Sequence, residues 1–319
     1  MKTLNFEKPI YDLYEKIEDL KRLSKEGQVE LSEEIGRIEK RAEAVKREIY
    51  ADLTATQILQ IARHQNRPDT LSIIQLMTSR FLELHGDRLY RDDPAIVGGL
   101  AQIGSYRVVI IGHQKGHDTK ENIRRNFGMP NPEGYRKAMR LMRLAEKFNL
   151  PIITLIDTKG AFPGKGAEER GQAEAIAKNL RDMSQLKVPI IAVVLGEGGS
   201  GGALGIGVAN KLYMLEYAVY SVISPEGCAS ILFRDASKSD IAAEALNITA
   251  KDIVKLGVSD GIIQEPLGGA HQSWEQTAEA IKTVLLKDLD LYSKKIRSPS
   301  KIVRERYNKF RLMGAWEEV

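Results

Sequence analysis

One pattern occurs twice in the middle of the chain: a short apolar run that begins X-Pro-Ile-Ile, a glycine-containing loop after it, and then a helix-like or glycine-rich stretch. The two prolines, Pro151 and Pro189, are 38 residues apart. Short apolar strands that are joined through helices are typical of parallel pairing in a sheet covered on both faces. The sequence therefore predicts an α/β fold around a parallel sheet.

The segments on either side of this repeat contribute further elements. Apolar residues at three- and four-residue spacing predict a helical hairpin over residues 7–50, which must dock on the main domain or on a partner. Residues 54–90 are expected to be mainly helical, and a Gly104-Ser105 turn predicts a β-hairpin. Further helices are expected at 133–148, 167–186 and from 274 onward, and short strands at 211–215, 220–223 and 259–266.

These elements divide the chain into three parts. We expect an N-terminal helical hairpin for partner docking, a main domain and a C-terminal helical tail, at residues 1–53, 54–296 and 297–319. With 319 residues and 43% hydrophobic side chains, the chain is long enough to bury a substantial core.

Composition limits the function classes. The single cysteine, Cys228, excludes an intrachain disulfide and a cysteine-based metal site. No apolar stretch approaches the roughly 20 residues that cross a membrane, and residues 1–8 lack a hydrophobic signal region. We therefore expect a cytoplasmic protein. Residues 115–147 carry nine basic and four acidic side chains, which indicates either an anionic partner or a solvated helix face.

The second apolar run ends in a segment, residues 196–207, in which seven of twelve residues are glycine. Gly196, Gly198 and Gly201 fit G-x-G-x-x-G, with Glu216 where a ribose-binding acid would belong, although the stretch before residue 211 is short for a crossover helix. The glycine pairs at 198–199 and 201–202 could equally form an oxyanion hole. Tight packing without a ligand is the third interpretation.

Other candidate groups carry less information. His113 and His117 lack the further ligands that a zinc site requires, and we expect His113 to make a local hydrogen bond. Ser200 is one residue out of register for a nucleophile elbow. Cys228 is expected to be core filler.

Six longer strings resemble, in the same order, the carboxyltransferase alpha-subunit family of bacterial acetyl-CoA carboxylase. The resemblance covers nearly the whole chain and is carried by residues 112–116, 124–130, 132–138, 196–202, 221–227 and 265–271. It implies a crotonase-like fold, a superhelix of ββα turns, with the N-terminal hairpin and C-terminal helices added to it.

The resemblance also implies an activity. Members of the family transfer a carboxyl group from carboxybiotin, held on the biotin carboxyl carrier protein, to acetyl-CoA, giving malonyl-CoA for fatty acid biosynthesis. They do so only with a beta subunit, in an α2β2 heterotetramer, while biotin carboxylase makes carboxybiotin with ATP. The family's zinc belongs to the beta subunit, so no metal is expected here.

Site residues follow from the same resemblance. It implies that the amides of Gly201 and Gly202 form the oxyanion hole for carboxybiotin, so that no histidine or glutamate base is required. It implies that substrates are bound by Gly198, Gly199, Gly160, Ala161, Phe162, Lys115, Arg124 and Arg125. The chain departs from the family at Lys159, where a proline is usual, so the loop over residues 157–164 loses a fixed φ and gains a cation beside the implied site.

Two other functions remain open from the sequence. The basic segment at 115–147 could serve a nucleotide- or nucleic-acid-binding regulator. A stand-alone acyl-CoA hydratase or thioesterase of crotonase type is the other alternative, although no pair of placed carboxylates is evident.

Overall fold

A computed structural model of the protein describes residues 4–27, 30–295 and 298–314. Its centre is an eight-stranded sheet with the order β1-β2-β3-β4-β5-β6-β8, in which β7 pairs with β5. In chain order the strands are β1 Arg80–Glu83, β2 Ile96–Ile103, β3 Tyr106–His113, β4 Ile152–Thr158, β5 Ile190–Gly199, β6 Lys211–Leu215, β7 Val219–Ser221 and β8 Gly261–Ile263.

The sheet is antiparallel at one end and parallel in the rest. β1, β2 and β3 pair antiparallel, with Ile103 opposite Tyr106 across the predicted turn. From β3 to β8 every pairing is parallel. All seven residues of β4 are buried, and so are nine of the ten in β5. The predicted parallel sheet and the β-hairpin are both present.

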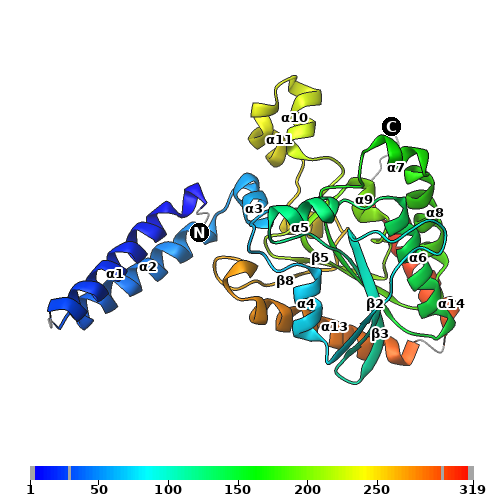
Figure 1. The fold of residues 1–319 in the computed structure, drawn as a ribbon, viewed down its shortest axis with the longest axis horizontal. Coiled ribbons are helices and arrows are strands. Elements are labelled where there is room, and N and C mark those ends of the chain that lie inside the picture. Colours follow the sequence, from blue (N-terminus) through cyan, green and yellow to red (C-terminus); the bar gives the residue numbers. More distant parts are fainter. Residues whose placement is uncertain (1–3, 28–29, 296–297, 315–319) are drawn as a thin grey trace.

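Helices cover both faces of this sheet (Figure 1). The α-helices are α1 Lys8–Gly27, α2 Ser32–Ala51, α3 Ala55–Ala62, α4 Thr70–Met77, α5 Thr119–Arg124, α6 Pro132–Lys147, α7 Lys165–Glu169, α8 Gln172–Gln185, α9 Ser200–Leu204, α10 Pro225–Phe233, α11 Ser239–Ala245, α12 Ala250–Lys255, α13 Trp274–Lys295 and α14 Pro299–Arg311. Short 3₁₀ turns are η1 Asn5–Glu7, η2 Asn126–Gly128, η3 Ala236–Lys238 and η4 Ala270–Gln272.

Two glycines in neighbouring strands show how closely the helices approach the sheet. A Cβ atom on Gly98 would lie 2.8 Å from Leu141 of α6, and one on Gly112 would lie 2.6 Å from Thr70 of α4. Gly112 pairs with Val97, the neighbour of Gly98, and successive residues of a strand face opposite sides. α6 and α4 therefore cover opposite faces of the same hairpin.

The N-terminal hairpin of α1 and α2 projects from the body, as Figure 1 shows, and confirms the helical hairpin expected at residues 7–50. Its base is joined to the body through a cluster of buried side chains that includes Ile10 and Tyr217. The Tyr50 hydroxyl donates hydrogen bonds to Glu7 Oε1 at 2.6 Å and to the Gly268 carbonyl at 3.1 Å. The remainder of the hairpin is largely solvent-exposed.

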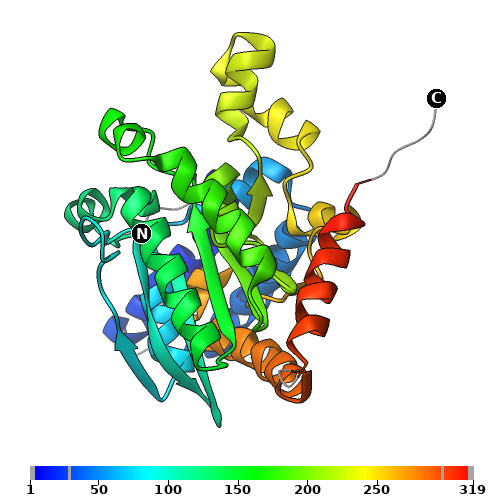
Figure 2. The same cartoon turned by 90° about the vertical axis from the view of Figure 1, so that its right-hand side faces the viewer.

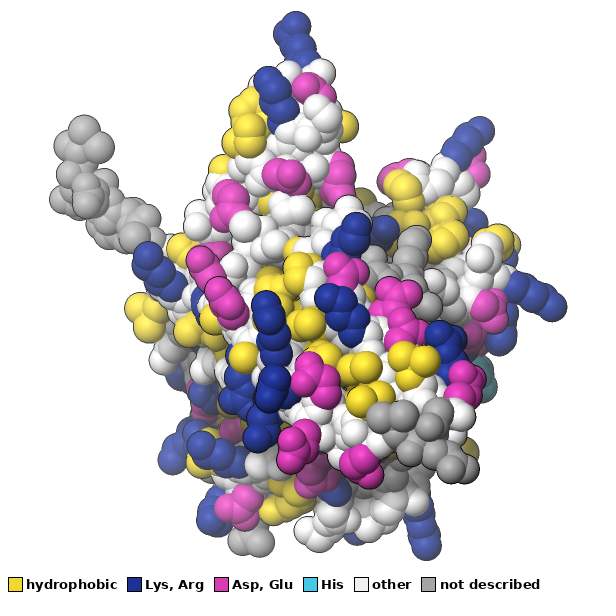
Figure 3. All heavy atoms as spheres, turned by 90° about the vertical axis from the view of Figure 1, so that its left-hand side faces the viewer, with side chains coloured by type: hydrophobic (Ala, Val, Ile, Leu, Met, Phe, Trp, Pro, Cys, Tyr) yellow, Lys and Arg dark blue, Asp and Glu magenta, His cyan; other side chains and the backbone are white. Residues whose placement is uncertain are grey.

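A second projection is formed by α10 and α11. Figure 3 shows it above the body, with hydrophobic and charged side chains mixed on its surface. α10 begins with Pro225 as its first residue, and the Ser224 hydroxyl accepts the Gly227 amide at 3.1 Å. Ile231 and Leu232 are about 70% exposed on this arm.

At the other end of the chain, α14 packs against α13 and α8 (Figure 2). The fully buried Arg306 fastens it to the body. The expected boundary at residue 296 falls outside the described residues, and the three-part division stays a prediction. No helix in the described ranges is both long and apolar enough to cross a membrane.

Two local predictions are wrong. Residues 80–83, expected within a helical segment, form the edge strand β1, because pairing with β2 outweighs the local preference. The single helix expected at 167–186 is two helices, α7 and α8. Gly171 separates them with a φ of +84°, in the left-handed region that glycine adopts without strain.

Candidate active site

The first glycines of the predicted loop belong to a strand. Residues 196–199 continue β5, and Gly198 pairs with Thr158 of β4 on one side and Tyr220 of β7 on the other. A Cβ on Gly198 would lie 2.2 Å from the Tyr220 ring, and one on Gly199 would lie 2.1 Å from the Lys159 carbonyl oxygen. These glycines are needed because three strand ends come together here.

This geometry does not suit a dinucleotide. The helix that follows, α9, has only five residues, and three glycines of the G-x-G-x-x-G pattern are divided between β5 and α9. A dinucleotide fingerprint requires a tight turn between a strand and a full crossover helix. Glu216 accepts a hydrogen bond from the Glu265 amide at 3.2 Å. The nucleotide interpretation is therefore wrong for this segment.

α9 begins in a strained conformation. Ser200 has a φ of +51°, which is uncommon for a residue with a side chain and is typical of functional sites. The amides in the first turn of a helix have no hydrogen-bond acceptor within the helix itself. In α9 these include Gly201 and Gly202. The turn at Ser200 thus presents two adjacent main-chain donors beyond the end of β5.

The two glycines differ in their surroundings. A Cβ on Gly201 would have only Ile176 near it, at 3.8 Å. A Cβ on Gly202 would lie 2.4 Å from the carbonyl carbon of Gly160 and 2.6 Å from the nitrogen of Ala161. Gly202 is therefore required for the close approach of the loop after β4, whereas Gly201 borders open space.

That open space is a cavity of about 670 Å³. It brings together five of the residues implied by the resemblance: Gly160, Ala161, Phe162, Gly201 and Gly202. Residues that the sequence did not single out as site residues complete its walls: Arg63, Pro163, Glu168, Gln172, Ala173, Ile176, Ser200, Val222, Ile223, Ser224 and Glu226, together with Lys159.

The loop after β4 is held in place by hydrogen bonds. The Thr158 hydroxyl donates to the Gly160 carbonyl at 2.7 Å, and the Phe162 amide donates to the Pro130 carbonyl at 2.9 Å. The buried Gln172 side chain donates to the carbonyls of both Pro130 and Phe162 at 2.9 Å. This wall of the cavity is therefore built before any ligand binds. Lys159 lies in this loop, exposed, beside the cavity.

Lys115 lies behind the glycines. Its ammonium nitrogen is 2.7 Å from Asp157 Oδ1 and 3.4 Å from Glu197 Oε1. Burial alone would lower the pKa of Lys115, but attraction to these two carboxylates outweighs it and raises that pKa. Burial alone would raise the pKa of Glu197, and Lys115 and Arg63 lower it instead. Lys115 thus ties the ends of β4 and β5 together.

The remaining candidates are placed elsewhere. Gly198 and Gly199 line a separate cavity of about 30 Å³, and Lys115 lines a polar one of about 190 Å³. Arg124 lines a further cavity of about 400 Å³. The Arg125 guanidinium is engaged with Glu121 at 2.9 Å and with the Pro94 carbonyl at 3.0 Å. The structure therefore does not gather all the predicted substrate-binding residues in one cavity.

The basic segment at 115–147 is largely neutralised within the fold. Arg136 pairs with Asp87 at 2.9 Å, and the buried Lys137 pairs with Asp92 at 2.6 Å. Arg143 pairs with Glu146 at 2.8 Å. These internal ion pairs remove the continuous cationic face on which the nucleic-acid interpretation depended.

Two buried groups behave as the sequence predicted. The Nδ1 atom of His113 accepts the Asp157 amide at 3.4 Å, a local hydrogen bond. Burial lowers the pKa of His113 to about 3, so its ring is neutral. Cys228 packs in a small cluster with Ala229 and Ala242. Among the described residues, no group of three or more His, Cys, Asp or Glu side chains is arranged to hold a metal ion.

Arg63 is the charged wall residue that the sequence missed. Its guanidinium is 2.8 Å from Glu197 Oε2 and 2.5 Å from Glu226 Oε1, so it links α3, β5 and the start of α10. Neither its spacing nor its neighbours mark it in the sequence. Ser224 and Glu226, in contrast, lie in the segment 221–227 that carries the family resemblance, and this signal could have marked them as wall residues.

Comparisons with known proteins agree on one family. The family model described as "Acetyl co-enzyme A carboxylase carboxyltransferase-like" matches residues 3–314. The chain is 52% identical, over 318 residues, to the acetyl-coenzyme A carboxylase carboxyl transferase subunit alpha of Methylococcus capsulatus, covering all of this chain and 98% of that protein. It is 54% identical to the same subunit of Halalkalibacterium halodurans, covering 99% and 97% of the two chains.

Solved structures show the fold. A chain of transcarboxylase 12S matches with a TM-score of 0.60 at 20% identity, over 74% of this chain and 44% of that one. A chain of the Pseudomonas malonate decarboxylase hetero-tetramer matches with a TM-score of 0.59 at 16% identity, over 76% and 94%. These likenesses confirm the predicted crotonase-like fold, and the full-length relatives confirm the resemblance. The chain therefore belongs to the alpha-subunit family of the acetyl-CoA carboxylase carboxyltransferases.

Proposed function

We propose that this chain is the alpha half of a carboxyltransferase that moves a carboxyl group from carboxybiotin to acetyl-CoA and so makes malonyl-CoA. We further propose that carboxybiotin enters the 670 Å³ cavity. One observation supports this proposal above all: Gly201 and Gly202 line the same cavity as the hydrogen-bonded loop after β4.

The lining of the cavity suits a biotin ring. Ligand sites are commonly 300–1,000 Å³ in volume, mostly apolar and furnished with a few fixed polar groups. Ala161, Phe162, Ile176, Val222 and Ile223 provide apolar surface here. The ureido group of biotin carries a carbonyl oxygen that accepts hydrogen bonds, and the main-chain donors of α9 are the matching groups.

Carboxybiotin supplies the carboxyl group, and the ureido oxygen gains negative charge as the carboxyl group departs. The amides of Gly201 and Gly202 are placed to donate to that oxygen. Each such donor contributes roughly 3 kcal/mol to stabilising the transition state. The close contact of Gly202 with Gly160 and the Lys115 ion pairs hold the two loops before the reaction starts. The biotin anion that remains can take the proton from the acetyl methyl group, so the reaction requires no base from this chain.

The rest of the assembly is proposed on the same basis. We expect a beta subunit to bind acetyl-CoA and to pair with this chain as α2β2. The biotin carboxyl carrier protein would bring carboxybiotin from biotin carboxylase, and the zinc of the family would lie in the beta subunit. A cytoplasmic location also remains a prediction.

A two-tube assay tests the proposal. Purified chain alone, and the same chain mixed with its beta subunit, would be supplied with carboxybiotin and acetyl-CoA, and malonyl-CoA would be measured. We expect malonyl-CoA only in the mixed tube. Equal activity of the chain alone would contradict the shared site and would favour a self-sufficient enzyme; no malonyl-CoA in either tube would contradict the reaction itself.

A further inference from the structure

We call the cavity of about 670 Å³ at Gly201 and Gly202 the reaction cavity. Phe162 lines both this cavity and a second one of about 400 Å³. Three arginines line the second cavity, from three different parts of the chain: Arg91, Arg124 and Arg170. Asn126 and Asn131 also line it. We call this space the arginine cavity. The proposed path of carboxybiotin does not use it, and of its arginines the resemblance implied a substrate-binding role only for Arg124.

The carboxylates beside the arginine cavity already have partners. Asp92 Oδ1 accepts the Lys137 ammonium at 2.6 Å and the Gly86 amide at 2.7 Å. Asp93 is 2% exposed, and its two oxygens accept the amides of Ala95 and Asn131 at 2.9 and 2.6 Å. These acids are therefore held by the surrounding chain, and among the described residues neither forms an ion pair with an arginine of the cavity.

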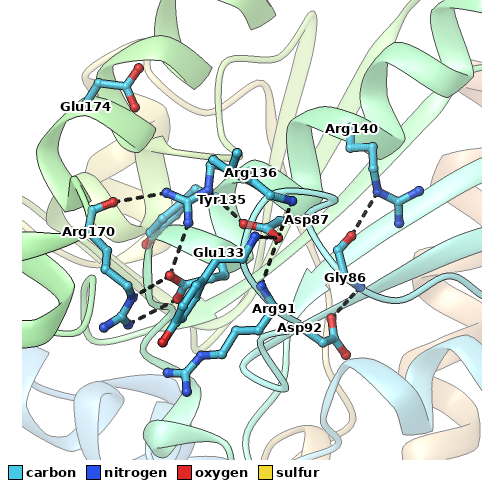
Figure 4. A network of polar contacts seen from close by, with 12 residues as sticks. Gly86, Asp87, Arg91, Asp92, Glu133, Tyr135, Arg136, Arg140, Arg170 and Glu174 are labelled. Carbon is cyan, nitrogen blue, oxygen red and sulfur yellow. Dashed lines mark hydrogen bonds and ion pairs between the residues drawn. The ribbon is translucent and has the colours of Figure 1, made fainter.

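The arginines, in contrast, keep donors available. Arg170 uses Nε and Nη2 on Glu133 and Asn131, which leaves Nη1 for another acceptor. In the ranges that the structure describes, neither Arg91 nor Arg124 has a carboxylate within ion-pair distance. The guanidinium carbons of Arg91 and Arg170 each lie 5.3 Å from the centre of the Tyr90 ring. Figure 4 shows both guanidinium groups ending on the same side of the polar network.

We propose that the arginine cavity binds a phosphate group. Like charges gathered at one cavity repel one another, and an anion between them removes that repulsion. Guanidinium forks match the paired oxygens of a phosphate and bind it through two parallel hydrogen bonds. The Asn126 side chain can add an amide donor.

The backbone at the cavity supports a functional role. Asn126 and Phe127 have φ values of +47° and +55°, although neither is glycine. Such conformations cost on the order of 1–3 kcal/mol each and are typical of ligand sites. The strain places Asn126 on the wall of the arginine cavity and Phe127 on the neighbouring polar cavity.

The phosphate has two possible sources. Coenzyme A carries a 3′-phosphate, and the shared wall at Phe162 brings the arginine cavity next to the reaction cavity. That source rests on the proposed function. Free inorganic phosphate is the other source, and its binding would not depend on the reaction.

Titration calorimetry with inorganic phosphate tests the site on the full chain at low ionic strength. Arg91→Gln and Arg124→Gln each remove one guanidinium, and each is expected to weaken phosphate binding about tenfold, as charge-assisted hydrogen bonds are lost. Arg107→Gln is the matched control, since Arg107 is exposed and lies elsewhere, on β3. The control is expected to bind like the unaltered chain. Absence of phosphate binding, or equal weakening in all three variants, would overturn the proposal.

A second titration, on the complex with the beta subunit, identifies the source. If the 3′-phosphate of coenzyme A occupies the site, Arg124→Gln weakens coenzyme A about tenfold but leaves 3′-dephospho-coenzyme A unchanged. If free phosphate is the ligand, both forms of coenzyme A bind the variant as tightly as they bind the unaltered complex. Inorganic phosphate still binds the variant more weakly. An acidic peptide that binds where phosphate does not would also overturn the proposal. None of these readouts measures turnover, so a failure here is distinct from a failure of the proposed function.

Discussion

The ammonium of Lys115 lies 2.7 Å from Oδ1 of Asp157, and the same oxygen accepts the Glu197 amide at 2.9 Å. One side chain from the segment after β3 thus fixes the ends of β4 and β5 relative to each other. The loop after β4 and the helix after β5 both line the reaction cavity, and they approach each other closely at Gly160 and Gly202. The ion pairs of Lys115 therefore help to hold these two parts of the cavity wall in position.

Replacing Lys115 tests this arrangement. Lys115→Met leaves two nearly buried carboxylates without their shared cation, and removing one partner of a buried ion pair typically costs about 3–5 kcal/mol. We expect a loss of free energy of unfolding of that order, measured by urea denaturation. Lys120→Met is the matched control, because Lys120 is an exposed lysine of the same basic segment. It is expected to change stability by less than about 0.5 kcal/mol.

The pH dependence of this effect has a defined sign. The pKa of Glu197 is lowered in the fold, so its contribution to stability is present above the unfolded pKa, about 4.3, and is lost as the pH falls through the folded pKa. Without Lys115 that pKa rises, while Arg63 still lowers it, and the contribution becomes smaller. The stability gap between unaltered chain and variant should therefore widen from pH 4 to pH 7. A gap that stays constant across this range would contradict the assigned role of Lys115.

The two glycines of the proposed oxyanion hole should respond differently to substitution. A side chain at Gly201 extends toward Ile176 and into open space, whereas one at Gly202 meets backbone at 2.4 Å. We expect Gly201→Val to keep its melting temperature while malonyl-CoA formation by the complex falls about 100-fold or more. We expect Gly202→Ala to lose about 1–3 kcal/mol of stability, because the Gly160 loop must move.

Differential scanning calorimetry and the activity assay together check this pair. Equal melting temperatures for both variants would contradict the close packing of Gly202. Full activity of Gly201→Val, in a complex that assembles normally, would contradict the use of the cavity.

Docking of α14 depends on Arg306. Its guanidinium donates to the carbonyls of Met183, Leu186 and Val188 at 2.7–2.8 Å and to the Asn210 side chain. Burial lowers the pKa of Arg306 to about 10, which still leaves it charged at neutral pH. Arg306→Met would leave these acceptors unpaired, and we expect a loss of at least 3 kcal/mol in free energy of unfolding. Arg304→Met, an exposed position of the same helix, should have little effect; equal losses in both would contradict this contact.

Much of the fold could be predicted from the sequence because its central strands are unambiguous. The apolar runs after Pro151 and Pro189 are buried on both faces, and few other structures accommodate such runs. β1 was missed because four residues carry too little periodicity, and only its pairing with β2 makes it a strand. Gly171 was missed because an isolated glycine within an amphipathic pattern does not reveal the sign of its φ.

The site was predicted in part for a similar reason. The carboxyl ends of the parallel strands β4 and β5 meet at one edge, so the loops that follow them had to lie together, and Gly160 and Gly202 do. The partners of a charged side chain are set by tertiary structure. Neither the burial of Lys115 between two carboxylates nor the position of Arg63 could be derived from local pattern. For the same reason, the net charge of the basic segment did not show that several of its charges are paired internally.

The central claim is that the Gly201 and Gly202 amides hold the ureido oxygen of biotin. A crystal structure of the complex with the beta subunit and bound biotin would test it most directly. The account predicts the ureido oxygen at hydrogen-bond distance, about 2.7–3.2 Å, from both amide nitrogens. A biotin ring bound outside the cavity, or amides already donating to groups of the protein, would contradict it.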